Sequence, residues 1–428
     1  MADSPLKAID PIMETAVCFE CVEDFHLKEI IKNEGAPLCC SVCGEVSNNA
    51  FTVDELGKLM EPIMREHFWQ GPEVKNFGEN DSEWWEQEGE PMSWVVQTVL
   101  GQYFEFEDEI VDAVIEAEDC WPQDGDDCFW DNTSLYIESR VKLGHYFAEW
   151  QFTLDELKHR RRFFSPAAEA LFDKLFAGVE ELKTWDDNLP VVINLPTNTK
   201  MFRARICNSQ SMLRDIYSDP FKHVGPPPKD YARSGRMNPE GVVVFYGAME
   251  EDTCLAEMRP ALGNDMAIIT LETNESLRLL DFSRLEHARS EKELSYFQPD
   301  FTEQVETQAF LRHIHKLISQ PVVPGRESDY LITQTMSEYL AHIHDKPFDG
   351  ILFASAQREK GTNVVLFVQS DLHTDSLADA FRLTYIAGSV SLFSTTSIKY
   401  EHIKLDVYQG ADGEPIIYHE HGDEIDDD

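Results

Sequence analysis

The sequence predicts an α+β protein, with a mainly helical N-terminal half and a C-terminal half built of strands with interspersed helices. Two observations support this class: apolar residues recur at helical spacing before residue 184, and short β-rich runs follow Met201. With 428 residues, of which 42% are hydrophobic, the chain has material for two or three domains. It has no apolar run of ~20 residues and no secretory leader, so we expect neither a membrane protein nor a secreted one.

The chain is strongly acidic, with 79 Asp and Glu against 36 Lys and Arg and a net charge of −43. Residues 51–140 alone hold 24 acidic and 4 basic side chains. Such a surface repels phosphate backbones, so we do not expect a nucleic-acid partner. A solvated acidic face is the simplest explanation, and a basic partner is the alternative.

Nine cysteines are present, an odd number, and five of them lie between Cys18 and Cys43. A disulfide framework suits small secreted chains, which this sequence does not resemble. We therefore expect a cytoplasmic protein with reduced thiols. Clustered thiols in that setting are typical of metal or catalytic sites.

Four of these cysteines form a C-x2-C-x18-C-x2-C array of Cys18, Cys21, Cys40 and Cys43. Each C-x2-C motif can place two thiolates on one tetrahedral ion, and four thiolates leave no open position for a substrate. The array therefore predicts a structural zinc rather than a catalytic one. The alternative is a set of buried free thiols, and the adjacent Cys39 could replace the third ligand.

The middle of the chain has helical apolar spacing in the stretches 53–68, 107–121 and 165–183. In the last stretch Ser165 is placed as an N-cap, with Pro166 in the first turn. The segment 185–200 follows, and its two prolines suggest a linker.

One pair in this region fits the R-x4-H pattern of HEPN ribonucleases, Arg140 and His145. With 18 Arg and 14 His in 428 residues, about 1.8 matches of R-x4–6-H arise by chance. We therefore expect no catalytic role for this pair. The basic run from His159 to Arg162, followed by two Phe residues, is better explained by docking between domains or by balancing nearby acids.

The C-terminal half contains five short β-rich runs and two helical patterns. The β-rich runs are 201–206, 241–249, 266–273, 350–356 and 362–368. The helical patterns are 302–319 and 330–345. The acidic tail 419–428 is expected to be disordered.

Candidate functional residues gather in the segment 234–257. Arg236 falls in a Gly- and Asn-Pro-containing turn before the apolar run VVVFY, which ends in Tyr246. A helix capped by Asp252 or Thr253 then directs Glu257 back toward the strand end. This layout brings a cation, an aromatic ring and a carboxylate to one cleft.

Such a trio suits NAD as a substrate. Cleavage of the nicotinamide–ribose bond builds an oxocarbenium-like cation, which a fixed carboxylate stabilises. A guanidinium grips pyrophosphate, and a tyrosine ring stacks on a base. From the residues alone an alternative stays open, in which Arg236 pairs with surface acids and Tyr246 is part of the core.

Residues 201–370 resemble the RES domain, a bacterial toxin module of toxin–antitoxin systems. The matching motifs are FRAR at 202–205, SGRMNPEG at 234–241, VVFYGA at 243–248, LAE at 255–257, DYLITQTMSEYL at 329–340 and DGILFASAQREKGTNVVLF at 349–367. The resemblance implies an ADP-ribosyltransferase-like split β-sheet and an enzyme that depletes NAD by phosphorolysis or hydrolysis. It makes Arg236, Tyr246 and Glu257 catalytic, and Arg203 and Ser355 substrate-binding. The Ser355 hydroxyl would bond the nicotinamide amide or a phosphate, or else satisfy a local turn.

The N-terminal half resembles the zinc-bearing HEPN/RES N-terminal domain, through the paired C-x2-C motifs and RRRFF at 160–164. The expected organisation is a four-cysteine zinc motif at 14–50, a helical regulatory domain at 51–184, a RES domain at 195–400 and an acidic segment at 401–428. Stand-alone RES toxins are small and have a separate antitoxin, so an antitoxin or trigger protein is the expected partner here. Two other function classes remain open: an ADP-ribosyltransferase acting on a protein or nucleic acid, and a HEPN-type ribonuclease or non-enzymatic interaction protein.

Overall fold

The computed structural model describes residues 14–77, 83–118, 120, 128–139, 141–290, 294–319, 330–368, 376–398, 406–409 and 415–418. These residues form two compact units. The first comprises the chain up to Val191 together with Arg284–Leu317, and the second comprises Val192–Ser283 and the chain from Ile318 onward. The second passage of the first unit, Arg284–Leu317, interrupts the second unit in sequence.

The first unit begins with a three-stranded antiparallel sheet in the order β1-β3-β2. Its strands are β1 (Ala16–Cys18), β2 (Ala36–Cys39) and β3 (Val46–Thr52). Between β1 and β2 lie the short 3-10 turn η1 (Phe19–Cys21) and the helix α1 (Phe25–Glu34). The Asp24 side chain caps α1 by accepting a hydrogen bond from the Leu27 amide at 2.8 Å.

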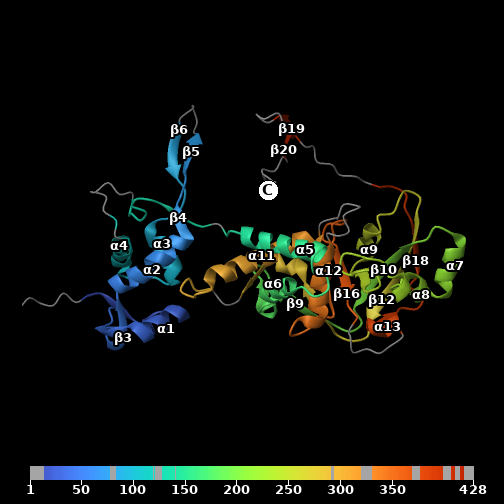
Figure 1. Ribbon diagram of the computed structural model, residues 1–428, viewed down its shortest axis with the longest axis horizontal. Helices are drawn as coiled ribbons and strands as arrows, with labels where there is room; N and C mark the ends of the chain where they lie inside the picture. The colour runs from blue at the N-terminus through green and yellow to red at the C-terminus, as the bar shows by residue number, and fades with distance from the viewer. Residues whose placement is uncertain are drawn as a thin grey trace, which may run out of the picture. The chain divides into compact units, whose positions relative to one another are not determined.

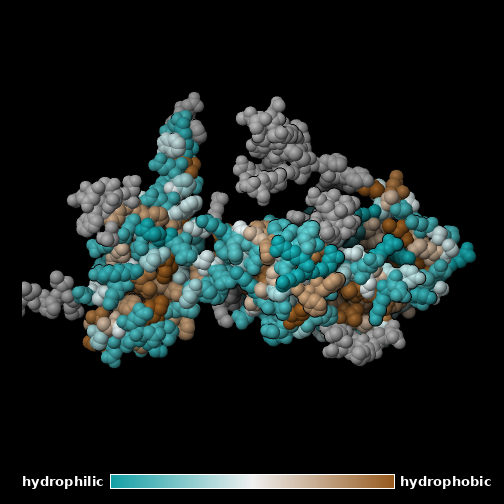
Figure 2. Space-filling model, viewed as in Figure 1, coloured by the Kyte–Doolittle hydropathy of each residue, from teal (hydrophilic) through white to brown (hydrophobic). Residues whose placement is uncertain are grey.

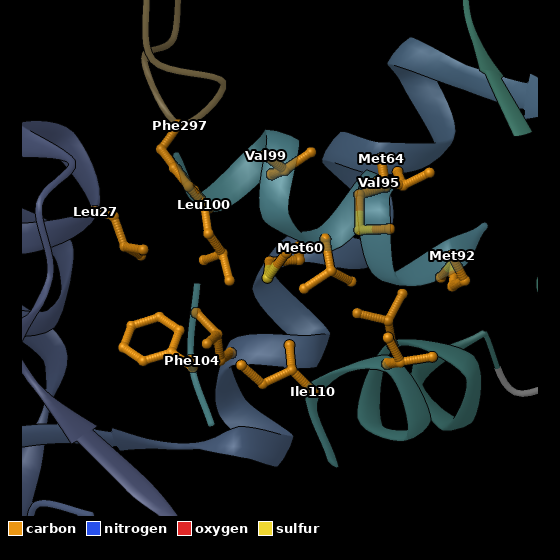
Figure 3. Packing of buried hydrophobic residues seen from close by; sticks show 14 of the residues in the cluster. Leu27, Met60, Met64, Met92, Val95, Val99, Leu100, Phe104, Ile110 and Phe297 are labelled. Carbon is orange, nitrogen blue, oxygen red and sulfur yellow. The ribbon is translucent and has the colours of Figure 1, made fainter. Parts of the chain in front are cut away.

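Three helices pack against one another and the first of them contacts β3; two of the three are those predicted from apolar spacing. They are α2 (Val53–His67), α3 (Met92–Leu100) and α4 (Glu107–Ala117). Thr52 and Glu55 form a capping box at the start of α2. Figure 3 shows Met60, Val99 and Ile110 from the three helices meeting in one apolar core, which Leu27 and Phe297 also join. Burial of such side chains is the main stabilising contribution to this unit.

Two antiparallel strand pairs extend the first unit: β4 pairs with β7, which lies far along the chain, and β5 pairs with the next strand, β6. Their bounds are β4 (Phe68–Gln70), β5 (Glu73–Phe77), β6 (Glu83–Gln87) and β7 (Tyr136–Glu138). The visible face of this region is mainly hydrophilic (Figure 2), as its acidic composition requires.

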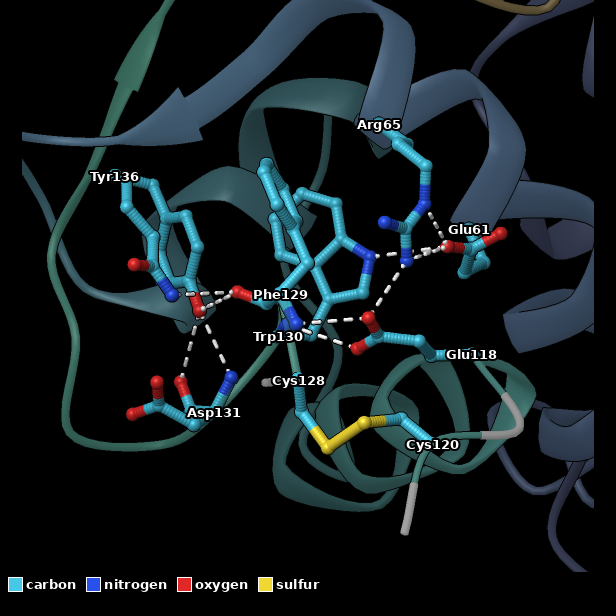
Figure 4. Close-up of a disulfide and its surroundings, with 10 residues drawn as sticks. Glu61, Arg65, Glu118, Cys120, Cys128, Phe129, Trp130, Asp131 and Tyr136 are labelled. Atoms are coloured by element: carbon cyan, nitrogen blue, oxygen red, sulfur yellow. Dashed lines mark hydrogen bonds and ion pairs between the residues drawn. A yellow bond between two sulfur atoms is a disulfide. The ribbon is translucent and has the colours of Figure 1, made fainter. Parts of the chain in front are cut away.

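The expectation of reduced thiols is wrong for one pair: Cys120 and Cys128 form a disulfide (Figure 4). The two Cα atoms lie 5.6 Å apart, a usual separation for a disulfide, and nearby Glu118, at the end of α4, accepts hydrogen bonds from the Phe129 and Trp130 amides. These bonds hold the chain after Cys128 against the helix that precedes Cys120. The remaining described cysteines are free thiols.

The rest of the first unit consists of helices and one short strand pair. These elements are α5 (Gly144–His159), α6 (Pro166–Phe176), η3 (Val179–Glu181), β8 (Leu182–Thr184), β14 (Ala288–Ser290) and most of α11 (Phe301–Ser319). The short helix α10 (Phe282–Leu285) begins in the second unit and ends in the first. Ser165 caps α6 with its side chain and Pro166 occupies the first position, as predicted. β8 and β14 pair antiparallel, which joins the returning segment to the first passage.

The described residues of the second unit include one mixed sheet of nine strands. Its path is β17-β12-β10-β11-β16-β15-β13-β9, with β18 also paired to β12. The strands are β9 (Val192–Leu195), β10 (Lys200–Ile206), β11 (Phe245–Ala248), β12 (Asp265–Thr273), β13 (Leu277–Asp281), β15 (Gly350–Ala354), β16 (Thr362–Leu366), β17 (Leu383–Tyr385) and β18 (Ser391–Ser394). The strands predicted at 201–206, 266–273, 350–356 and 362–368 are therefore present, whereas the ADP-ribosyltransferase-like description of the sheet stays a prediction.

Two local expectations are corrected in this unit. The segment 185–200, expected as a linker, contributes β9, because its apolar run pairs with β13 at the edge of the sheet. The run VVVFY is not one strand: Val243 and Val244 are buried in irregular structure, and the strand begins only at Phe245.

Helices flank this sheet, as Figure 1 shows in the green-to-red part of the chain. They are α7 (Gln210–Ser218), α8 (Pro220–Val224), η4 (Lys229–Tyr231), α9 (Glu251–Glu257), α12 (Leu331–Glu338), the π-helical turn η6 (Tyr339–Ile343) and α13 (Leu377–Ala380). A separate strand pair, β19 (Asp406–Gln409) and β20 (Pro415–Tyr418), follows. The predicted disordered tail, 419–428, lies outside the described residues.

No helix in the described part of the chain is both long and apolar enough to span a membrane.

Candidate functional site

A cleft of about 1000 Å³ opens in the second unit. Its walls come from β10, β11, β16, the end of α9 and the loop that carries Arg236. Four of the five residues singled out from the sequence line it: Arg203, Arg236, Tyr246 and Glu257. Residues far apart in the sequence are brought together because β10, β11 and β16 are neighbours in the sheet.

Arg203 projects from β10 and is tied to the floor of the cleft. Its Nε donates to the Val224 carbonyl at 2.8 Å, and its Nη1 donates to the Tyr246 carbonyl. Burial lowers the pKa of the Arg203 guanidinium to about 10, so the side chain stays charged at neutral pH. The structure thus fixes one cation deep in the cleft.

Arg236 lies in a loop that a single amide side chain organises. The Asn238 Nδ2 donates to the carbonyls of Arg233, Pro239 and Val242 at 3.0, 3.1 and 2.8 Å. The Gln334 side chain adds hydrogen bonds to the same loop. Arg236 itself is half-buried, and its Nη1 donates to the Ile318 carbonyl.

The Tyr246 hydroxyl is engaged with the same loop. It donates to Asn238 Oδ1 and accepts from the Met237 amide, both at 2.9 Å. Burial raises the pKa of Tyr246 to about 12, so the phenol is neutral at physiological pH. The ring lines the cleft while the hydroxyl holds the Arg236 loop, a second task that the sequence did not indicate.

Glu257 ends α9 and is held from the neighbouring strands. Its Oε1 accepts from Ser355 Oγ at 2.6 Å and from Asn363 Nδ2 at 2.7 Å. The predicted cap of α9 is wrong: the helix begins at Glu251, after Glu250, rather than being capped by Asp252 or Thr253. Glu250 instead accepts hydrogen bonds from the Thr253 hydroxyl and the Thr362 amide, which fasten the helix start to β16.

Ser355 and Asn363 are therefore the supports of Glu257. Ser355 Oγ also accepts from the amides of Gln357 and Arg358 at 3.1 and 3.2 Å, so it caps a turn, one of the two alternatives for this residue. It is absent from the described residues that line the cleft. Asn363, which was not singled out from the sequence, does line the cleft and is 7% exposed. The sequence feature that could have pointed to Asn363 is its position as a lone amide in the apolar strand TNVVL.

The electrostatic character of the cleft differs from that of the whole chain. Among the described residues that line it, Glu257 is the one carboxylate. Six cationic side chains face it: Arg203, Arg205, Lys222, Arg233, Arg236 and Arg259. An anionic ligand is the chemistry that such a lining favours.

The four predicted zinc ligands also come together, in the first unit. The sulfur atoms of Cys18, Cys21, Cys40 and Cys43 all lie within 4.8 Å of one another. Burial disfavours the Cys40 thiolate, but backbone amides of Cys43, Cys18 and Val42 outweigh it and lower the pKa of this thiol to about 7. Four thiols at this spacing could hold a zinc ion. Cys39 stands outside the cluster and donates to the Gly44 carbonyl at 3.7 Å.

The structure describes only one member of the R-x4-H pair. Arg140 lies outside the described residues. His145 is exposed in the first turn of α5, with its Nε2 at 3.8 Å from Glu149.

Comparison with known proteins supports one part of the chain. Neither a curated protein nor a solved structure matches the sequence. The HEPN/RES N-terminal resemblance of the first unit stays a prediction. Residues 202–386 match the family model of the RES domain, so the C-terminal part of this chain carries a RES domain.

Proposed function

We propose that the second unit consumes NAD by cleaving the bond between nicotinamide and ribose, with water or phosphate as the acceptor. The observation that carries this proposal is a carboxylate, Glu257, fixed by two hydrogen bonds in a cleft whose other charged lining residues, among those described, are Arg and Lys. The RES-domain match supports the same conclusion.

The chemistry requires a single fixed negative charge at the reacting carbon. As the bond between ribose C1′ and the pyridinium nitrogen breaks, its electron pair goes to the nitrogen and nicotinamide leaves as a neutral ring. The ribose develops oxocarbenium character, which the Glu257 carboxylate stabilises more strongly than it stabilises the ground state. Water, which releases a proton to solvent, or phosphate then adds to C1′, giving ADP-ribose or its 1-phosphate.

The cations serve the other end of the substrate. A guanidinium has five N–H donors, and Arg203 uses two of them on backbone carbonyls, so the others can bind a phosphate oxygen. Arg236 offers a second planar fork for the pyrophosphate. The Tyr246 ring provides an apolar wall, and its fixed hydroxyl keeps the Arg236 loop in place.

We also propose that Cys18, Cys21, Cys40 and Cys43 hold a structural zinc. The soft thiolate donor set and the mutual sulfur distances, all within 4.8 Å, fit that ion. A zinc there would cross-link β1, η1 and the end of β2.

Incubation of the purified protein with NAD, with and without inorganic phosphate, tests the enzymatic proposal. We expect free nicotinamide together with ADP-ribose or its 1-phosphate. Glu257→Gln should lower the rate by about 10²–10³, by analogy with the loss of one transition-state hydrogen bond. NAD should bind this variant within a few-fold of wild type.

Three outcomes contradict the proposal or redirect it. Normal turnover by Glu257→Gln excludes the catalytic role of this carboxylate. An intact NAD pool excludes NAD cleavage as the activity of the isolated chain. ADP-ribose attached to a protein or nucleic acid identifies a transferase instead.

A further inference from the structure

The cations of the cleft are distributed in two sets. Arg203 and Arg236 are half-buried, whereas the other four are exposed. We call these four the rim: Arg205, Lys222, Arg233 and Arg259. In a chain with 79 acidic and 36 basic residues, four exposed cations around one opening are a marked local excess.

The rim cations lack acidic partners. Within the described residues, none of the four forms an ion pair with a carboxylate, and Arg205 donates instead to the His223 carbonyl at 2.6 Å. Cations elsewhere do pair, as Lys174 does with Glu303 at 3.0 Å and Arg382 with Asp349 at 3.0 Å. Like charges gathered around one opening repel one another, so the set favours binding of an anion that offsets this repulsion.

Two rim cations, Arg205 and Lys222, lie next to the inner cation Arg203. Arg205 follows Arg203 by two residues on β10, so both side chains leave the same face of the strand. The hydrogen bond from Arg205 to His223 brings it beside Lys222, at the mouth of the cleft. A ligand whose pyrophosphate lies at Arg203 would meet this pair with a group further out.

The cleft has more cations than the negative charges of NAD require. The pyrophosphate of NAD is matched by the two inner guanidiniums, and its pyridinium ring is itself cationic. A phosphate monoester adds about −1.5 to −2 charges at neutral pH and three acceptor oxygens. Such a group would supply the negative charge that the rim cations favour.

We propose that the rim binds a third phosphate, a monoester carried by the dinucleotide itself, so that the preferred substrate class is the 2′-phosphorylated dinucleotide NADP rather than NAD. This inference rests on the proposed function for the chemistry, but the recognition it describes is a property of binding. We expect Arg205 and Lys222 to contribute most to the binding of this third phosphate.

Binding of unreactive product-type ligands provides the test, because it does not depend on turnover. Titration calorimetry on the full chain at constant ionic strength should show that 2′-phospho-ADP-ribose binds at least about tenfold more tightly than ADP-ribose, the least expected of one charge-assisted contact. The double variant Arg205→Gln with Lys222→Gln should abolish most of this preference. With active enzyme, kcat/KM should favour NADP over NAD by a similar factor.

A matched control removes the same charge elsewhere. Lys200→Gln with Arg214→Gln deletes two exposed cations of the same unit that do not line the cleft, and it should keep the preference. Equal affinity of wild type for the two ligands overturns the proposal. An equal loss in the control and the rim variant also overturns it, because net charge alone would then explain the effect.

Free phosphate is the other source of a monoester-like dianion. If the rim variant loses the response of NAD cleavage to inorganic phosphate while wild type shows no 2′-phosphate preference, the rim serves the acceptor and the proposal is wrong. If neither dinucleotide is cleaved but the binding preference is present, the proposed function fails while the inference about the rim stands.

Discussion

At the scale of the residue, one oxygen atom organises the site. Glu257 Oε1 accepts from both Ser355 and Asn363, which leaves the carboxylate anchored through one oxygen while the side chain faces the cleft. The LAE motif singled out Glu257, and the family resemblance supplied Ser355. Asn363 could not be recognised in the same way, because its role depends on the pairing of β15 with β16, which places it opposite Phe353.

We predict that Asn363→Ala lowers kcat about 10- to 100-fold with little change in KM, since hydrogen bonds to charged groups are worth about 1.5–3 kcal/mol. Asn363→Asp should be worse than the alanine variant, because an isosteric carboxylate cannot donate and repels Glu257. A role in packing alone would give the opposite order. Asn194→Ala, an exposed amide on β9 of the same sheet, serves as the control in initial-rate measurements.

At the scale of the element, local signals predicted most helices and strands, and long-range hydrogen bonds account for the errors. The prediction that Ser165 caps α6 was correct because the two bonded residues lie within one turn of each other. The predicted cap of α9 was wrong because Glu250, before the helix, bonds to Thr362, more than a hundred residues away in sequence. The edge strand β9 was taken for a linker, since nothing local indicates that β13 is available to pair with it.

The Arg236 loop is an element whose geometry allows a direct test. A Cβ added at Gly235 would lie 2.7 Å from the Tyr246 hydroxyl oxygen and 2.7 Å from Asn238 Oδ1. Gly235→Ala should therefore displace the loop and lower kcat/KM by up to about 10²-fold, the effect of a displacement of about 1 Å. Gly144→Ala, where the added Cβ meets nothing within 4 Å, is the matched control. Unchanged kinetics of Gly235→Ala would show that the loop does not position Arg236.

At the scale of the whole molecule, the two units have separate apolar cores. One cluster of buried apolar side chains in the first unit is built from residues between Val17 and Tyr136 together with Phe297, and one in the second unit lies between Leu195 and Leu383. The return of Arg284–Leu317 to the first unit could not be predicted, because its helical spacing does not reveal which core it joins. Because the chain forms two compact units, we expect two unfolding transitions rather than one.

This separation leads to a prediction about the cysteine cluster. Elemental analysis should find one zinc per chain, and its removal by a chelator should lower the first unit's unfolding temperature while leaving that of the second unit unchanged. A four-thiolate zinc contributes about 10–16 kcal/mol of apparent binding energy in small peptides, and here it would join β1 to the end of β2. Calorimetric scans of the intact chain would resolve the two transitions.

The adjacent residues Cys39 and Cys40 provide a closely matched control for this prediction. Cys40→Ser removes a member of the cluster, whereas Cys39→Ser removes a thiol that stands outside it and bonds only weakly to the Gly44 carbonyl. Only Cys40→Ser should lower the zinc content and the first transition. If both substitutions act alike, the effect belongs to the strand end and not to a metal site. Zinc-free protein that unfolds like the wild type contradicts the structural role of the ion, because binding energy that is lost must appear as lost stability.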